Sequence, residues 1–266
     1  MRILILGDVM GPAGREVVKK NLQKIIRNNN INFTIINGEN SADSGRGITK
    51  SIADEFFLAG ADVITSGNHI WDKQETTEFI NKENRLLRPA NFVEGSPGKG
   101  FGIFYTKDKK FKIAVINLMG NVFMKKTENV FEVAKKIKNE IKLKKDVDFM
   151  IIDFHGETTS EKMAMAHFFD GYSTGVVGTH THVPTADTRI LKNGTAYQTD
   201  LGMCGDYDSV IGMNKENSLK KFFKEKDALQ HFPAKGEATL SGIIIEADLQ
   251  TGLAKKIDRI FEGKIF

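Results

Sequence analysis

The stretch Ile3-Leu4-Ile5-Leu6-Gly7-Asp8 is a continuous apolar run that stops at a glycine and an acid. The same pattern returns twice early in the chain, where Thr34–Ile36 precedes Asn37-Gly38-Glu39-Asn40 and Asp62–Thr65 precedes Ser66-Gly67-Asn68-His69. Continuous apolar runs of this length are typical of strands buried on both faces, because helices or a second sheet cover them. The sequence therefore predicts buried strands that end in polar tips.

The pattern continues in the middle of the chain, with helix-compatible stretches between the strands. The further predicted strands are Ile113–Ile116, which ends at Asn117, Phe149–Ile152, which ends at Asp153-Phe154-His155, and Gly175–Val177, which ends at Gly178-Thr179-His180-Thr181-His182. The predicted helices are Arg15–Arg27, Thr49–Ala59, Lys73–Asn81, Val130–Lys144 and Glu161–Phe168. Alternating strands and helices predict an α/β fold.

The last third changes character. Three stretches predict strands, Gly194–Asp200, Leu240–Asp248 and Ala254–Phe261, and the Lys-rich stretch Asn214–Asp227 predicts a surface helix. Because no Pro-rich or Ser-rich linker divides the chain, we expect a single domain over residues 1–266.

Composition limits the classes of protein and partner. The 266 residues include 38 basic and 34 acidic side chains, a net charge of +4, which permits a polyanionic ligand but is weaker than the basic surface of a dedicated duplex binder. Cys204 is the single cysteine, which excludes an intrachain disulfide and favours a cytoplasmic location. The N-terminal apolar run is too short for a signal peptide, and no apolar stretch approaches the roughly 18 residues of a membrane span.

Polar side chains at the ends of parallel strands meet at one edge of a sheet, where ligands bind in α/β proteins. We therefore expect one group of side chains to converge there, namely Asp8, Glu39, Asn40, Asn68, His69, His155, His180 and His182. Taken singly, Asp8 would more often be a helix N-cap, and His155 would more often be a hydrogen-bonded buried histidine than a ligand. The pair His180 and His182 favours a metal site, because residues two apart in an extended chain share a face.

Imidazole, carboxylate and amide ligands without a thiolate suit Mn, Fe or Zn in an open catalytic geometry. The candidate ligands exceed what one transition metal takes from a protein. Two ions about 3.5–4 Å apart would use them and would form a site for in-line phosphoryl displacement. Such a pair needs a bridging acid, and Glu39 is well placed for this role.

The chain resembles the calcineurin-like metallophosphoesterases in the order of its polar blocks, which are Gly7-Asp8, Asn37–Asn40, Gly67–His69, His155 and Gly178–His182. Longer blocks resemble the YmdB family of bacterial phosphodiesterases within that group, over nearly the whole chain: Ile36–Asn40, Gly67–His69 with Trp71-Asp72, Arg88–Phe92, Asp153–His155, and Gly178–Ala186 followed by Thr199-Asp200. The resemblance implies a sandwich of two central sheets flanked by helices (αββα). It also implies hydrolysis of small phosphodiesters, namely 2′,3′-cyclic and, as further substrates, 3′,5′-cyclic nucleotides.

Two departures from the broader group affect the metal. The group begins Asp-x-His, whereas this chain has Asp8-Val9-Met10, so that Asn40 would supply an amide oxygen instead. The bridging residue is Glu39 where most of the group has aspartate. An oxygen-rich site favours Fe or Mn, with Zn or Mg as alternatives.

The resemblance also implies roles for single residues. One ion would be held by Asp8, Glu39, Asn40 and His182, and the other by Glu39, Asn68, His155 and His180. A hydroxide bridging the ions would be the nucleophile, because metal binding lowers the pKa of water to about 7. His69 is not a ligand in the family, so it would serve as a general acid or as an orienting histidine.

Residues around this centre leave alternatives open. Asp72 and Asp187 would accept hydrogen bonds from ligand histidines or would stabilise turns. Arg46 and Lys50 would contact the substrate or would lie in a solvated loop. His167 is predicted to pack beside Phe168, and His231 has no identifiable partner.

Three other functions remain open. They are a phosphomonoesterase, a regulatory nucleotide-binding module with residual catalysis, and an RNA-associated protein, for which the Lys-rich segments 135–145 and 214–226 give weak support. The sequence also leaves homo-oligomer formation open.

Overall fold

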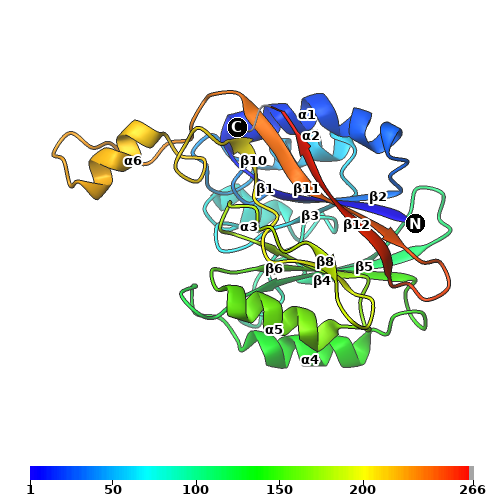
Figure 1. The fold of residues 1–266 in the computed structure, drawn as a ribbon. Coiled ribbons are helices and arrows are strands. Elements are labelled where there is room, and N and C mark those ends of the chain that lie inside the picture. Colours follow the sequence, from blue (N-terminus) through cyan, green and yellow to red (C-terminus); the bar gives the residue numbers. More distant parts are fainter. Residues whose placement is uncertain (264–266) are drawn as a thin grey trace.

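The computed structural model describes residues 1–263. Two six-stranded sheets pack face to face; α1 and α2 cover the outer face of one, and α4 and α5 cover the outer face of the other (Figure 1). The predicted α/β class and the αββα layers are confirmed.

The first sheet has the strand order β12-β11-β10-β1-β2-β3. Its strands are β1 (Arg2–Val9), β2 (Phe33–Asn37), β3 (Val63–Thr65), β10 (Met203–Asp206), β11 (Ala238–Ala247) and β12 (Ala254–Glu262). Strands β10, β1, β2 and β3 run parallel, and β11 and β12 add an antiparallel edge.

The second sheet has the strand order β4-β5-β6-β7-β9-β8. Its strands are β4 (Phe101–Tyr105), β5 (Lys112–Met119), β6 (Phe149–His155), β7 (Gly175–Thr179), β8 (Arg189–Ile190) and β9 (Ala196–Gln198). Strands β5, β6, β7 and β9 run parallel.

The helices are α1 (Gly11–Asn28), α2 (Lys50–Ala59), α3 (Gln74–Phe79), α4 (Val130–Glu140), α5 (Thr159–Phe169) and α6 (Lys215–Phe222). Their ends follow local chemistry: the Thr49 hydroxyl accepts the Ile52 N–H at the start of α2, and Gly60, with φ of 118°, ends that helix. Among residues 1–263, no helix combines the length and apolar character needed to cross a bilayer.

Strand β1 shows why the layers form. Ile3 and Ile5 lie in the core between the two sheets, whereas Leu4 and Leu6 lie in the core beneath α1 and α2. Successive side chains of a strand point to opposite faces, so a run that is apolar at every position is buried on both faces. The apolar runs of the sequence therefore indicate strands that are buried on both faces.

Several boundaries differ from the predicted ones. Helix α4 ends at Glu140 rather than Lys144, because Ile141 is extended, and α6 ends at Phe222, with Lys224 at a φ of 57°. The strand predicted over Gly194–Asp200 shrinks to the three residues of β9. Strands β4, β8 and β10 were not predicted: β8 and β10 are short, and β4 is a partly exposed edge strand.

Candidate metal centre

The polar tips of both sheets meet at one edge of the sandwich. Asp8 lies near the end of β1 and His155 ends β6, while the other candidates follow β2, β3 and β7. A hydrogen bond joins the two sheets there, since Asp8 Oδ2 accepts the backbone N–H of His180 at 3.0 Å. All the predicted site residues of this edge lie in one connected cluster: Asp8, Glu39, Asn40, Asn68, His69, His155, His180 and His182.

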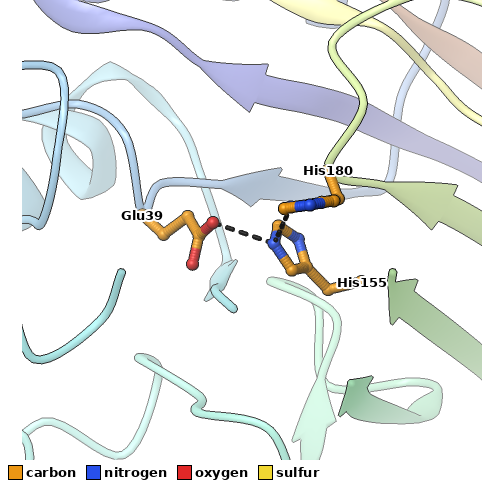
Figure 2. A group of neighbouring side chains, drawn as sticks. All are labelled: Glu39, His155 and His180. Carbon is orange, nitrogen blue, oxygen red and sulfur yellow. Dashed lines mark hydrogen bonds and ion pairs between the residues drawn. The ribbon is translucent and has the colours of Figure 1, made fainter. Parts of the chain in front are cut away.

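His155 lies at the centre of the cluster. Its Nε2 lies 2.9 Å from Glu39 Oε1, 3.0 Å from Asn68 Oδ1 and 3.0 Å from His180 Nδ1. Figure 2 shows Glu39, His155 and His180 pointing toward one another. A single N–H can serve only one of these three neighbours well, so this arrangement suits a cation better than a hydrogen bond.

The outer nitrogen of His155 is Nδ1, which faces away from the cluster. Its hydrogen-bond partner identifies the tautomer of the neutral ring. Thr179 donates its only hydroxyl hydrogen to Asp153 Oδ1 at 2.7 Å, so the Thr179 oxygen can only accept from His155 Nδ1, 3.0 Å away. The proton of the neutral ring therefore sits on Nδ1, and Nε2 presents its lone pair to the cluster. An outer hydrogen bond of this kind orients histidine ligands in metal sites.

The other two histidines are held in the same way. His182 Nδ1 lies 2.8 Å from the carbonyl oxygen of Ile211, which can only accept, so its Nε2 faces Asn40 Nδ2 at 3.1 Å and Asp8 Oδ1 at 3.7 Å. Rotating the Asn40 amide by 180° would put its oxygen at that position. His180 Nε2 lies 3.3 Å from the Glu157 carboxylate, which leaves Nδ1 facing inward.

The buried charges of the cluster also match a cation site. Glu39 Oε1 is buried and accepts no hydrogen bond of good geometry among the described residues, although His155 Nε2 lies 2.9 Å away. Burial opposes ionisation, but the neighbouring His155 lowers the pKa of Glu39, and Glu39 and Asp8 raise the pKa of His155. Burial and the His155 charge lower the pKa of His180 to about 3. The donor set therefore fits a divalent metal.

Asp8 is fully buried and belongs to this cluster, and burial raises its pKa. The alternative that Asp8 caps the following helix is wrong. Met10 is the N-cap of α1, and no side chain caps that helix.

The extended-chain argument for His180 and His182 is also wrong. Strand β7 ends at Thr179, and the φ angles of the two histidines are 105° and 65°. Their rings consequently enter different parts of the cluster, His180 beside His155 and His182 beside Asn40. Such backbone angles are unfavourable for residues other than glycine, so the fold must hold this loop in place.

His69 lies at the rim of the cluster. Its backbone N–H donates to Glu39 Oε2 at 2.9 Å, and its Nδ1 lies 2.8 Å from Asp72 Oδ2. The prediction that Asp72 accepts a hydrogen bond from a ligand histidine is therefore wrong in its partner, since Asp72 holds His69. Asp187 instead stabilises a turn, accepting the hydroxyls of Thr185 and Thr199 at 2.6 Å each.

A cavity of about 390 Å³ opens beside the cluster and is lined by Arg46, His69, His180 and His182, among others. Lys50 is not part of its lining and pairs with Asp54 on α2. A larger cavity of about 660 Å³ lies elsewhere, between α1 and the 235–238 segment, and contains none of the candidate ligands.

Two histidines outside the cluster differ from expectation. His231 also lines the 390 Å³ cavity. The sequence did not indicate this position, because the residues around His231 do not show which part of the fold its loop contacts. His167 is exposed on α5 rather than packed, since the buried side of that helix carries Met165, Ala166 and Phe169.

Comparison with known proteins identifies the family of this chain. A family model described as YmdB-like protein matches residues 4–260. The chain belongs to the YmdB-like family. A relative from Bacillus subtilis (strain 168), named 2′,3′-cyclic-nucleotide 2′-phosphodiesterase, is 48% identical over 260 residues, which cover 98% of this chain and 96% of the relative.

Solved structures of similar fold include a novel phosphatase from Mycoplasma pneumoniae, with a TM-score of 0.90, 37% identity, and coverage of 99% of this chain and 93% of that one. A putative 5′-nucleotidase from Staphylococcus aureus has a TM-score of 0.60 at 14% identity and covers 97% of this chain and 53% of that one. The second likeness shows the fold alone.

Two glycines of this YmdB-like chain make room for the cluster. A Cβ added at Gly67 would lie 2.1 Å from His155 Cδ2, and one added at Gly178 would lie 1.7 Å from the carbonyl oxygen of Thr199. Both contacts are far inside van der Waals distance. Gly178 therefore allows the backbone to approach the Thr199 carbonyl closely, and Gly67 leaves space for the His155 ring.

Proposed function

We propose that this YmdB-like protein is a metal-dependent phosphodiesterase that hydrolyses small phosphodiesters, with 2′,3′-cyclic nucleotides as its first substrates. The observation that carries the proposal is the inward convergence of nitrogens from His155, His180 and His182 beside Glu39 Oε1, a buried oxygen that accepts no hydrogen bond of good geometry among the described residues. The name of the Bacillus subtilis relative supports the substrate class.

We assign the ligands to two divalent ions. Asp8, Asn40 and His182 would hold one ion and Asn68, His155 and His180 the other, with Glu39 shared between them. Glu39, His155 and His180 bring ligand atoms within 4.8 Å of one another, whereas His182 Nε2 faces Asn40 and Asp8, and this division supports two positions. Manganese and iron suit this oxygen-rich set, with zinc and magnesium as alternatives.

Divalent ions, when bound, polarise phosphoryl oxygens and lower the pKa of coordinated water. In the hydrolysis of a 2′,3′-cyclic nucleotide, the oxygen of water forms a bond to phosphorus and the bond between phosphorus and O2′ breaks. O2′ then needs a proton, and the product is a nucleoside 3′-phosphate. The remaining residues of the site must therefore orient the diester and supply this proton.

His69 is our candidate for the proton donor. Asp72 holds its Nδ1 at 2.8 Å, which leaves Nε2 as the ring nitrogen without a partner among residues 1–263. His69 also lines the cavity where the diester would bind. A carboxylate that orients the ring and compensates a positive charge on it is typical of a histidine general acid.

Arg46 is our candidate for substrate contact. It is exposed at the cavity, and no carboxylate pairs with it among the described residues. An unpaired guanidinium beside a phosphodiester site suits a phosphate oxygen, because charge-assisted hydrogen bonds to anions are strong. Lys50 lies outside the lining, so the structure offers no support for a substrate contact there.

The test is an assay of the purified protein with Mn²⁺ or Fe²⁺. We expect conversion of 2′,3′-cyclic AMP to adenosine 3′-monophosphate, and a loss of roughly a hundredfold or more in Asp8→Ala and His180→Ala, because each removes a ligand. His167→Ala is the matched control, since His167 is an exposed histidine on α5. Folded ligand variants with full metal-dependent activity on bis(p-nitrophenyl) phosphate would overturn the proposal.

A phosphomonoesterase is the second candidate, favoured by the name of the Mycoplasma pneumoniae structure. The same assay separates the two, since a phosphomonoesterase would hydrolyse adenosine 3′-monophosphate faster than the cyclic diester. A cytoplasmic location, a single domain, homo-oligomer formation and RNA association stay predictions.

A further inference from the structure

The cavity beside the metal cluster has an apolar side as well as a polar one. A single segment, residues 210–222, contributes Val210, Ile211, Met213 and Phe222 to its lining. Helix α6 belongs to this segment and projects from the body of the sandwich (Figure 1). A phosphodiester group alone would need no apolar lining, so this side of the cavity suits another part of a ligand.

Phe222 is the most exposed of these side chains. It is 74% exposed at the end of α6, and Ile211 is 53% exposed. Exposed apolar side chains that line a cavity next to a polar site are typical of ligand contacts. Phe223, its neighbour in the sequence, is 75% exposed but is not part of the lining.

Two methionines of the cavity lining lie together. A Cβ added at Gly45 would lie 2.6 Å from Met10 Cε and 3.2 Å from Met213 Cε, so both thioether methyls lie against that glycine. Met10 is buried and Met213 partly so. Thioethers make favourable contacts with flat aromatic rings and adapt to their shape.

One hydrogen bond ties the apolar segment to the metal cluster. The carbonyl oxygen of Ile211 accepts from His182 Nδ1 at 2.8 Å, and Ile211 itself has a φ of 49°. The segment that supplies the apolar lining therefore also orients a candidate metal ligand. A ligand that reaches both has its anionic and flat apolar parts next to each other, as in a nucleotide.

We propose that residues 210–222 form the nucleobase subsite of this enzyme, with Phe222 as the stacking ring and Met10 and Met213 beneath the base. The inference rests on the proposed function, which it deepens by naming what holds the base. A cavity of about 390 Å³ lies within the usual range of roughly 300–1,000 Å³ for ligand sites. Because every base has an aromatic face, stacking on Phe222 predicts little preference among the four bases.

The test compares ligands with and without a base. Isothermal titration calorimetry with Mn²⁺ present measures the affinities of adenosine 3′-monophosphate and of methyl ribofuranoside 3-phosphate for the full chain. We expect the base to increase affinity about tenfold in the unchanged protein, this gain to disappear in Phe222→Ala, and the gain to persist in Phe223→Ala. In parallel, the ratio of kcat/KM for 2′,3′-cyclic AMP over methyl ribofuranoside 2,3-cyclic phosphate should fall about tenfold in Phe222→Ala.

The outcomes separate this inference from the proposed function. Hydrolysis with an equal gain from the base in all three proteins would overturn the subsite and leave the phosphodiesterase proposal standing. A base-dependent gain lost only in Phe222→Ala, without hydrolysis of any diester, would support the subsite and overturn the proposed activity. Equal losses in Phe222→Ala and Phe223→Ala would also overturn the subsite, because a general change in α6 would then explain them.

Discussion

Lys162 donates a hydrogen bond of 2.7 Å to Asp200 Oδ2 between two side chains that are each 1% exposed. The same carboxylate accepts the backbone N–H of Thr181 at 3.1 Å, between His180 and His182, and that of Gly202 at 2.8 Å. Lys162 is thereby linked through Asp200 to the loop of positive φ that carries two candidate ligands. We infer that this ion pair helps to position the loop that carries the two candidate ligands.

We predict that Lys162→Met lowers the free energy of unfolding by about 3–5 kcal/mol, because the substitution leaves Asp200 buried without its cation. The measurement is guanidinium unfolding of the metal-free protein followed by circular dichroism. Lys256→Met is the control, since Lys256 pairs with Asp258 at the surface, where such pairs contribute about 1 kcal/mol or less. Equal losses in the two variants would show that the buried ion pair stabilises the fold no more than a surface pair does.

Divalent metal should stabilise the protein through the Glu39 cluster. At a concentration a hundred times the dissociation constant, a ligand adds about 2.7 kcal/mol to the free energy of unfolding. For a chain of this size that corresponds to a rise in Tm of roughly 5–10 °C. Differential scanning calorimetry with and without Mn²⁺ measures this shift.

Glu39→Gln should lose most of the rise, because it removes the buried carboxylate shared between the two proposed positions. Each variant serves as its own reference, so a change in metal-free stability does not confuse the comparison. Glu140→Gln, at the exposed end of α4, should keep the full shift. An unchanged shift in Glu39→Gln would show that the metal binds elsewhere.

Substrates with different leaving groups can show whether His69 is a proton donor or only an orienting histidine. If His69 supplies a proton to O2′, His69→Gln should lower kcat for 2′,3′-cyclic AMP by about 10²–10⁴-fold. The loss should be far smaller for bis(p-nitrophenyl) phosphate, whose leaving group is stable without a proton. Asp72→Asn should show the same selectivity in weaker form, because Asp72 orients the ring at 2.8 Å. Equal losses on both substrates would indicate orientation alone.

Much of the fold was predictable because the interior strands are buried on both faces. The runs that became β1, β2, β3, β5, β6 and β7 are continuous and apolar, and their polar tips lie where expected. Edge and short strands carry no such signal: β4 is half exposed, and β8 has two residues. The pairing of two sheets came from family resemblance, because local sequence does not report which sheet faces which.

The candidate ligands were predictable as residue types at strand ends, but the contacts that orient them were not. Thr179, the Ile211 carbonyl and Glu157 each hold an outer nitrogen of a histidine. Ile211 acts across a separation of 29 residues and through its backbone, which side-chain chemistry cannot reveal. The prediction that His167 is packed was wrong for a similar reason, because aromatic neighbours in sequence do not specify which side of a helix faces the core.

Cys204 offers a probe of the sheet beneath the cluster. It is buried in β10, opposite Val9 of β1, and its carbonyl accepts the Met10 N–H at 2.9 Å. Burial raises the pKa of this thiol to about 12, with the Asp8 charge adding to the effect. Because the raised pKa favours the neutral thiol in the folded state, its contribution to stability is complete below the unfolded pKa of about 8.5 and is lost as pH rises toward 12.

We therefore predict that Cys204 in the native protein barely reacts with a disulfide reagent at pH 9, because the folded thiol is buried and its raised pKa keeps it neutral. The same protein in guanidinium should react at once, and Cys204→Ser, which removes the single cysteine, should not react at all.

Labelling requires β10 to separate from β1, which carries Asp8. Saturating Mn²⁺ should accordingly slow labelling by up to about a hundredfold at a hundred times its dissociation constant, because opening this strand pair would release the metal. A labelling rate unaffected by Mn²⁺ would mean that Asp8 does not hold the ion.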